Sequence, residues 1–340
     1  EGPIAKTKSL SGGSSTFILT AKNSYLAQSS KLLYKYIDDG GLPFNFTDVY
    51  GKISFSDGNG SKLNLFAFNY NDSVKYKAIS DFGWNATGIG SNFVLIPGSS
   101  ASLLEGSISY SAYKLSLDQT NAPERMSSIN NFTALMSITT FIGKSQVKSG
   151  FELSGLSTKF NYTNNVHRVI DHTKNTSEIA MFVTYKYQGR KLIVEPGFRL
   201  HAYVSLPALS PEPRISAKYI VSDKFRIKLA SGIYSQNIIA ANSDYDVVNL
   251  FYGFLAEPDN LQESFEGNRI TSRLQKSQHL ILGVELEPAK FVLLNIEGYY
   301  KNFSQLININ RNKIFDADDE TVEERYRTDF LIEKGNARGL

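Results

Sequence analysis

The side chains that could perform metal or acid–base chemistry are few and widely spaced in this sequence. Its 340 residues include four histidines, His167, His172, His201 and His279, and no cysteine. The absence of cysteine excludes thiolate catalysis, disulfides and Cys-ligated metal sites. His167 and His172 could share a metal ion on one loop. The simpler interpretation is that both are solvated, because no His-Glu-x-x-His or other zinc-type spacing is present.

Two further arrangements would carry chemistry if the fold assembled them. A serine with His201 and either Glu195 or Glu285 could form a hydrolytic triad, although the sequence contains no Gly-x-Ser-x-Gly motif. The acidic run at 316–320 could attract calcium, but it lacks the glycine and the spaced ligands of an EF-hand loop. A solvated acidic loop explains it more simply. We therefore predict no catalytic residue, no bound metal, no cofactor and no enzyme activity.

Composition narrows the class of protein without selecting a function. Hydrophobic residues make up 41% of the chain and charged residues 20%, and the formal net charge is only +3. Basic residues are scattered rather than clustered, so nucleic acid is not an expected partner. Ser, Asn, Thr and Gly fill the remainder without a high net charge, which argues against disorder.

An alternation of apolar and polar side chains with a period of two dominates the chain. Leu280, Leu282 and Val284 alternate with more polar residues, and the segments 225–233 and 292–298 repeat the pattern. Successive side chains of a strand point to opposite faces, so each segment has an apolar face and a more polar one. Only residues 24–36 have a helical period. We predict about fourteen strands, near 13–21, 45–56, 61–71, 81–96, 101–117, 125–143, 146–161, 176–188, 190–204, 213–221, 224–236, 275–287, 290–304 and 323–334.

Short and long connections alternate between the predicted strands. The tight turns are expected at 57–60, 97–100, 143–146, 188–190, 222–224 and 287–290. The longer polar loops are expected near 22–44, 72–80, 118–124, 162–175, 205–212, 237–274 and 305–322. This alternation is typical of an all-β, antiparallel, up-and-down sheet, and closing such a sheet into a transmembrane β-barrel would pair every backbone polar group in lipid. The alternatives are a soluble β-sandwich, a β-helix or an adhesin.

Charged side chains fall on one face of these strands. The residues predicted to face the lumen of the barrel are Glu195, Arg199, Arg226, Glu285 and Glu297. The apolar residues of the same strands are expected to face lipid, where a mid-strand Arg or Lys costs about 2–4 kcal/mol. This separation favours a membrane protein over a soluble one. Tyrosines near strand ends, including Tyr110 and Tyr203, suit aromatic girdles at the membrane interfaces.

The longest predicted connection, about 237–273, combines aromatic and acidic residues. Aromatic rings offer a large contact area at little entropic cost, and carboxylates accept hydrogen bonds from hydroxyl-rich or cationic ligands. A loop of this length without structure of its own is usually functional or disordered. The alternative is a loop that packs over the barrel mouth and buries its own aromatic rings. The ligand-binding candidates are Asp244, Tyr245, Asp246, Phe251, Tyr252 and Phe254.

Eight short segments occur in an order and at a spacing that point to one family. The segments are Glu1–Ile4, Ser15–Ala21, Phe46–Ile53, Trp84–Asn85, Pro213–Tyr219, Gly232–Gln236, His279–Glu285 and Glu297–Lys301. They resemble segments of the barrel domain of TonB-dependent outer-membrane receptors, especially the branch with a carboxypeptidase-regulatory-like domain before the plug. Each segment is short and degenerate, so their order carries more weight than any single match.

The resemblance implies a receptor that binds a scarce solute and imports it across the outer membrane of a Gram-negative cell. Its expected partners are outer-membrane lipid, a plug domain, TonB and an unknown small solute. Both ends look like cuts through a longer chain, so we expect residues 1–340 to be part of a barrel whose plug is not included. The alternative function is a non-transport β-protein, either a membrane-anchored adhesin or a soluble carbohydrate-binding module.

Overall fold

The computed structural model describes residues 1–6, 12–36, 40–76, 79–98, 101–119, 122–163, 169–242, 252–256, 258, 260–309 and 329–340. Within these residues the chain is almost entirely β-structure, with a single helix, α1 (Leu26–Leu33). No helix in the described part is long and apolar enough to cross a membrane.

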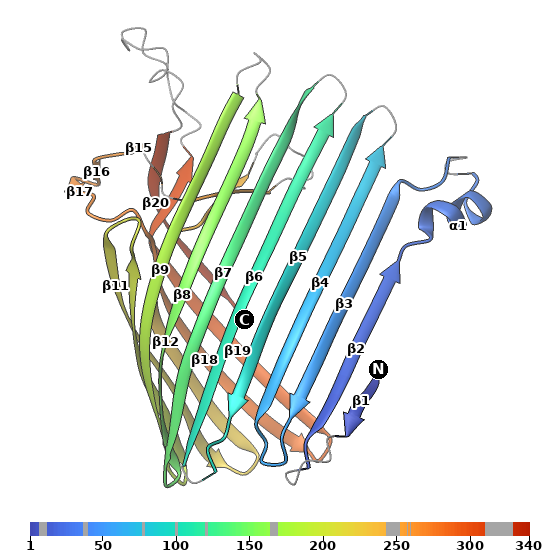
Figure 1. The fold of residues 1–340 in the computed structure, drawn as a ribbon. Coiled ribbons are helices and arrows are strands. Elements are labelled where there is room, and N and C mark those ends of the chain that lie inside the picture. The colour runs from blue at the N-terminus through green and yellow to red at the C-terminus, as the bar shows by residue number, and fades with distance from the viewer. Residues whose placement is uncertain are drawn as a thin grey trace. The chain divides into compact units, whose positions relative to one another are not determined.

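The strands lie in the main sheet in nearly the order in which they occur in the chain (Figure 1). Their bounds are β1 (Gly2–Lys6), β2 (Ser14–Asn23), β3 (Phe44–Ser56), β4 (Lys62–Tyr76), β5 (Ser80–Leu95), β6 (Ser102–Gln119), β7 (Ala122–Ile142), β8 (Ser145–Thr163), β9 (Val169–Gln188), β10 (Leu192–Tyr203), β11 (Ala208–Ser222), β12 (Phe225–Gln236), β13 (Ile239–Asn242), β14 (Tyr252–Leu255), β15 (Asn260–Leu261), β16 (Ser264–Phe265), β17 (Asn268–Arg269), β18 (Gln275–Ala289), β19 (Val292–Ile309) and β20 (Asp329–Gly339). The main sheet has sixteen strands in the order β1 to β12, then β18, β19, β20 and β15. This is an up-and-down sheet.

The chain forms two compact units. The first comprises residues 1–136, 153–175 and 240–255, and the second comprises residues 137–152, 176–239 and 256–340. We describe the faces of the sheet in each unit separately.

In the first unit, strand register gathers apolar side chains on one face. Phe17 pairs with Ile53, and Ile53 pairs with Leu65, so the three share a face. All three are exposed, as are Leu19 and Ile89 on the same side. We call this side the aliphatic face. Strands β2 to β6, which carry it, run side by side in Figure 1.

The opposite face of the first unit carries a buried cluster. Val74, Phe82, Leu115 and Leu117 pack together there, and Trp84 lies against them. This cluster fixes which way β4, β5 and β6 turn their side chains, because a slip of one residue would exchange the two faces.

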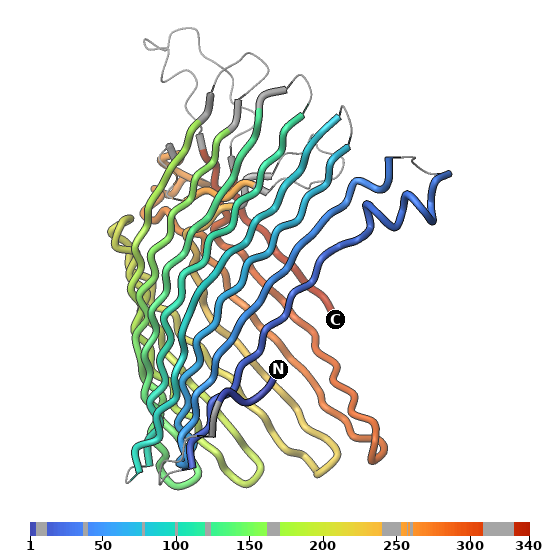
Figure 2. The backbone as a smooth tube through the Cα atoms, turned by 45° about the vertical axis from the view of Figure 1, so that its right-hand side comes forward, coloured from blue at the N-terminus to red at the C-terminus, as the bar shows by residue number. Residues whose placement is uncertain are grey.

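The second unit separates its faces in the same way. Its aliphatic face carries the exposed side chains of Leu280, Leu282, Leu294 and Ile296. On the other face, register places Arg226 opposite Glu285, and Gly283 opposite Glu297. The tight hairpin that joins β18 to β19 is drawn in orange in Figure 2.

The predicted helix and all fourteen predicted strands are present, but several strands are longer than predicted. β4 continues to Tyr76 and β6 to Gln119, while β9 begins at Val169 and β11 at Ala208. The prediction of long loops near 72–80, 118–124, 162–175 and 205–212 is therefore wrong for most of these residues. Their polar composition is typical of loops, yet the ladder continues through them, as in the pairing of Tyr76 with Ser80.

The prediction that the connection between β12 and β18 has no structure of its own is also wrong. In its described part, β13 pairs with β14, β16 pairs with β17, and β15 runs parallel to β20. Segments of two to four residues are too short to show a period. The same reason explains why the sequence pattern does not predict β1.

A carboxylate organises the tight turn between β3 and β4. Asp57 Oδ1 accepts hydrogen bonds from the backbone N–H groups of Asn59 (2.9 Å) and Ser61 (2.8 Å). Gly60 adopts a φ of +96°, which favours glycine. Although desolvation raises the pKa of Asp57, the hydrogen bonds from Ser61 and Asn59 outweigh it and hold this pKa below its ordinary value.

We expect acid to weaken this turn. A carboxyl whose pKa is lower in the folded state contributes stability above its unfolded pKa, about 3.9, and loses it as the pH falls through the folded pKa. The melting temperature of the protein should exceed that of the Asp57→Asn variant at neutral pH, and the gap should close as the pH falls below about 4. A gap that stays constant as the pH falls would contradict the assignment.

Candidate functional site

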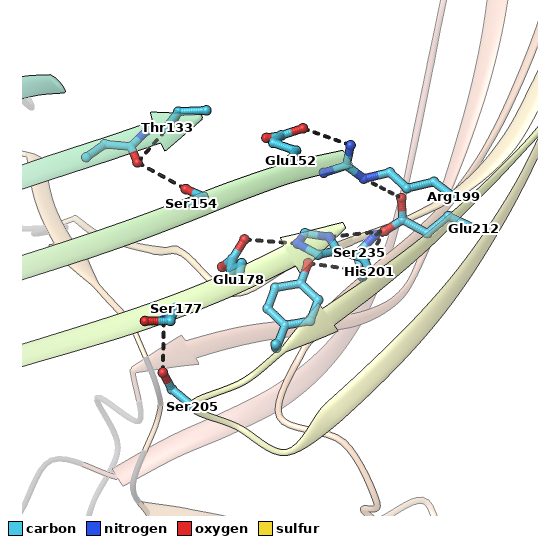
Figure 3. A network of polar contacts seen from close by, with 12 residues as sticks. Thr133, Glu152, Ser154, Ser177, Glu178, Arg199, His201, Ser205, Glu212 and Ser235 are labelled. Carbon is cyan, nitrogen blue, oxygen red and sulfur yellow. Dashed lines mark hydrogen bonds and ion pairs between the residues drawn. The ribbon is translucent and has the colours of Figure 1, made fainter. Parts of the chain in front are cut away.

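A connected group of charged and hydrogen-bonding side chains lies on β8 to β12, on the face opposite the aliphatic face (Figure 3). All of its members belong to the second unit. We call it the buried charge cluster. Its members are Glu152, Glu178, Arg199, His201, Tyr203, Glu212, Arg214 and Ser235.

Glu212 of β11 is the centre of the buried charge cluster, and its side chain is only 2% exposed. Its Oε2 accepts a hydrogen bond from Arg214 Nη2 at 2.6 Å. Its Oε1 accepts hydrogen bonds from the backbone N–H (3.1 Å) and the hydroxyl (2.7 Å) of Ser235. Glu212 lies between two prolines, which have no N–H, and the pairing of β11 with β12 stops at Arg214. The carboxylate therefore accepts a backbone hydrogen bond at a point where the strand ladder is interrupted.

Arg199 of β10 links two carboxylates. Register places it opposite Glu212, and its Nε lies 3.9 Å from Glu212 Oε2. Its Nη1 donates a hydrogen bond to Glu152 Oε2 at 2.9 Å. The Arg199 side chain is only 18% exposed. Charges shielded to this degree are stable only while each keeps its partner, so the cluster behaves as a unit.

His201 of β10 lies between two further carboxylate oxygens. Its Nε2 is 3.1 Å from Glu178 Oε2, and its Nδ1 is 3.8 Å from Glu212 Oε1. The imidazole stacks on the Tyr203 ring, with the centroids 4.1 Å apart, and the Tyr203 hydroxyl is 3.0 Å from Ser235 Oγ. Tyr203 is 2% exposed. The prediction that it belongs to an interfacial girdle is therefore wrong, since its hydroxyl needs a buried partner and finds one here.

The geometry does not form the hydrolytic triad considered from the sequence. Neither Glu195 nor Glu285, the acidic candidates considered for such a triad, contacts His201, because Glu178 and Glu212 occupy that position. A nucleophilic serine must hydrogen-bond to its base, whereas Ser235 Oγ donates to Glu212. The three carboxylates and two guanidinium groups of the buried charge cluster have a net charge of −1, which a protonated His201 would balance. The arrangement suits a rigid hydrogen-bonded wall.

A second charged group, the turn-end charge cluster, lies on β11, β12 and β18. Glu285 is 2.7 Å from Arg226 Nη1, 2.8 Å from Lys228 Nζ and 3.2 Å from Lys218 Nζ. Lys218 and Lys228 are directly opposite one another in the sheet. Like charges in such a pair are destabilising, so Glu285 offsets their repulsion.

The five residues predicted to face the lumen all lie opposite the aliphatic face, but they do not form one site. Arg199 belongs to the buried charge cluster, whereas Arg226 and Glu285 pair with one another in the turn-end charge cluster. Glu195 and Glu297 line a hollow of about 390 Å³, which Lys218 and Lys228 of the turn-end charge cluster also line. The structure thus distributes these charges along the wall.

Only part of the predicted ligand-binding connection lies within the described residues. The Phe254 backbone N–H donates a hydrogen bond to Ser127 Oγ at 3.1 Å, and its ring meets Tyr113 edge to face, with centroids 6.1 Å apart. Phe254 thus packs against the wall, as expected for a loop that buries its own aromatic rings. Tyr252 lies on β14. The candidates outside the described residues are Asp244, Tyr245, Asp246 and Phe251.

The structure describes only some of the histidine and acidic metal candidates. His167 and the run at 316–320 lie outside the described residues, whereas His172 lies on β9. His279 stacks on Tyr234 with the ring centroids 4.6 Å apart. In the part of the chain that the structure describes, no group of three or more His, Asp or Glu side chains is placed to hold a metal ion.

Sequence reasoning missed five members of the buried charge cluster. These are Glu152, Glu178, Glu212, Arg214 and Ser235. Most of their partners lie on other strands, and a local pattern contains no information on cross-strand register. One local signal was available: the Pro-Glu-Pro segment at 211–213 marks a break in the ladder where an acceptor side chain can replace a backbone group.

No protein-family model matches the sequence, and no curated protein matches it. Solved structures do match its fold. OprC, a copper transporter, has a TM-score of 0.59 at 12% identity, over 96% of this chain and 52% of its own. A variant of PfeA, the ferric enterobactin receptor of Pseudomonas aeruginosa, has a TM-score of 0.62 at 9% identity, over 99% of this chain and 57% of its own. Fiu, the ferric-catecholate import receptor of Escherichia coli, has a TM-score of 0.60 at 10% identity, over 89% and 56%.

The chain therefore has the fold of the barrel of outer-membrane receptors and transporters. This confirms the predicted fold class, an all-β, antiparallel, up-and-down sheet of the kind found in TonB-dependent receptors. The chain spans about half the length of these structures.

Proposed function

We propose that this chain forms part of the barrel of an outer-membrane receptor that binds a scarce solute and imports it with energy from TonB, transmitted through a plug domain. The observation that carries the proposal is the separation of the two faces of the sheet. Leu280, Leu282 and Leu294 are exposed on one face, while charges on the other face are paired with one another. A membrane barrel needs this separation, whereas soluble proteins rarely expose large apolar patches.

On this proposal the charged face lines the lumen. Glu195, Arg199, Arg226, Glu285 and Glu297 would then contact water or solute. The two charge clusters hold neighbouring strands together, and the hollow of about 390 Å³ beside Glu195 offers both apolar and charged side chains to a passing solute. The solved neighbours carry different cargoes, copper in one case and ferric catecholates in another, so the fold does not select the solute.

Growth on limiting nutrients tests the proposal. Cells that lack this protein should grow more slowly than their parent on at least one scarce solute from a panel of ferric siderophores, copper, cobalamin and oligosaccharides. Loss of TonB should reproduce the same defect, and the full-length gene should restore growth. Loss of surface attachment without any growth defect would instead support an adhesin, which is the alternative from the sequence.

Cysteine labelling tests the orientation of the strands. The protein has no cysteine, so single cysteines give an unambiguous signal. Cysteines replacing Asn59, Gly189 and Ala289, all at the tight-turn end, should resist an impermeant thiol reagent in intact cells. A cysteine at Ile79, which is 67% exposed at the other end of β4, should react. Asp259, a further position for outside labelling, lies outside the described residues. Equal labelling of both ends would contradict the orientation.

A further inference from the structure

We propose that the first unit binds one outer-membrane glycolipid on the aliphatic face of β2 to β6. The hydrocarbon chains would lie in an apolar hollow, and the hydroxyl-rich headgroup would lie on an array of asparagine side chains on the same strands. The inference rests on the proposed function only in requiring that this face contacts lipid.

The hydrocarbon part of the site is a hollow of about 850 Å³. Its floor is formed by small residues, because Gly51 and Ala67 are cross-strand neighbours and Ser91 lies beside Leu65. The walls are larger apolar side chains, which include Phe17, Leu19, Ile53, Leu65, Ile89 and Ile108. A row of small residues among large ones gives the aliphatic face a depression that an acyl chain can fill with close contact.

The headgroup part of the site is a ring of four hydrogen-bonded side chains on β4 and β5. Asn71 Nδ2 donates to Asn69 Oδ1 at 2.6 Å, and Asn69 Nδ2 donates to Thr87 Oγ1 at 2.7 Å. Thr87 Oγ1 donates to Asn85 Oδ1 at 3.4 Å, and Asn85 Nδ2 donates to Asn71 and closes the ring. Each amide has two N–H groups and uses one of them in the ring, so three further donors remain for a ligand.

The ring and the hollow lie on the same face of the same two strands, with the ring further along the strands. Asn71 follows Ala67 by four residues on β4, and Asn85 precedes Ile89 by four residues on β5, so each pair shares a face. Four strand residues span about 13 Å. A second hollow, of about 320 Å³, lies beside Asn71 and Asn85, and Lys114 also lines it.

The order in which apolar, amide and charged residues occur along this face determines which ligand fits the site. Apolar residues come first, then the neutral amides, and then a charged row in which Lys75 pairs with Asp81. Amides that donate and accept in fixed directions match the hydroxyl groups of sugars, and Lys114, which lines the second hollow, can bind one phosphate. A soluble sugar would leave the apolar hollow empty, whereas a phospholipid has few hydroxyl groups for the amides. A glycolipid fits both parts.

A matched pair of double variants tests the site. Asn71→Ala with Asn85→Ala removes the ring. Asn64→Ala with Asn92→Ala removes an amide pair, joined at 2.7 Å, from the opposite face of the same two strands. The full-length protein and both variants are purified in mild detergent, and the retained lipids are quantified by mass spectrometry. The ring variant should retain about tenfold less lipopolysaccharide, since two hydrogen-bonding groups are lost. The control should match the parent.

Added lipid provides a second readout. Lipopolysaccharide should raise the melting temperature of the parent more than phosphatidylethanolamine does. The Ala67→Leu variant, whose new side chain fills the hollow, should show no such difference between the two lipids. This second variant keeps the test valid even if the ring variant fails to assemble. Equal retention of lipopolysaccharide by both double variants, or equal stabilisation of the parent by both lipids, would overturn the inference. Heat-modifiable migration on gels reports the barrel separately. A parent that shows no such migration contradicts the proposed function, whereas unchanged glycolipid binding in well-assembled variants contradicts only the glycolipid site.

Discussion

Replacing Glu212 with alanine is expected to lower the free energy of unfolding by about 3–5 kcal/mol, because the change leaves buried charges without their partner. Glu212 is 2% exposed and contacts Arg199, Arg214 and His201, and it also accepts the backbone N–H of Ser235. Its loss therefore removes charge pairing and leaves an interrupted strand ladder without an acceptor. Glu212→Gln, which keeps an acceptor for Ser235, should lose less. Denaturant unfolding in detergent micelles measures the effect.

Glu297→Ala is the matched control for this variant. Glu297 lies on the same face of the sheet, but its side chain is 47% exposed and its nearest cation, Lys228, is 4.0 Å away. An exposed pair of this kind contributes less than about 1 kcal/mol. If Glu212→Ala cost no more than Glu297→Ala, the buried charge cluster would not stabilise the wall.

An arginine at Leu294 should block assembly of the protein in the outer membrane, whereas an arginine at Asn295 should be tolerated. Leu294 is 46% exposed on the aliphatic face, where a lipid-facing cation costs up to about 2–4 kcal/mol, depending on its depth in the bilayer. Asn295 lies on the other face, opposite Glu285 in the sheet and hydrogen-bonded to Glu297, so both carboxylates can pair with the new charge. The heat-modifiable fraction in isolated outer membranes measures assembly. The reverse ranking would mean that the strand register is shifted by one residue.

The strands were predictable because the period of two is a local signal. Leu280, Leu282 and Val284 alternate with polar residues within a single strand, and the turn at 57–60 contains the glycine that its backbone requires. The strand ends were less predictable. Residues 71–76 are polar enough to resemble a loop, yet their backbone groups pair with β5 throughout. The polarity of a side chain indicates its environment and not whether its backbone is paired. At these strand ends the side chains on the aliphatic face are polar, so the strand resembles a loop in sequence.

For the candidate site, the sequence could predict only on which face of the sheet each charged residue lies, and not which residues it contacts. The alternation around Arg199 and Arg226 places each on the face opposite apolar residues, and those apolar residues are exposed in the structure. Which carboxylate each contacts depends on register between strands distant in the sequence, as between Arg199 and Glu152. No local pattern contains that information. The same limit explains why Glu195 and Glu285 were the acidic candidates considered for His201, whereas Glu178 and Glu212 lie beside it.

Quenching of a single tryptophan by brominated lipids tests the central claim most directly, because it reports whether the aliphatic face contacts hydrocarbon. The only tryptophan, Trp84, lies opposite the aliphatic face against Phe82, with ring centroids 4.4 Å apart. In a Trp84→Phe background, Leu282→Trp places the probe on the aliphatic face and Ser216→Trp places it on the charged face. Reconstituted in bilayers of brominated lipid, the Leu282→Trp protein should lose most of its emission, and the Ser216→Trp protein should retain its emission. Equal emission from both, or quenching of Ser216→Trp alone, would contradict the assignment of the aliphatic face to lipid.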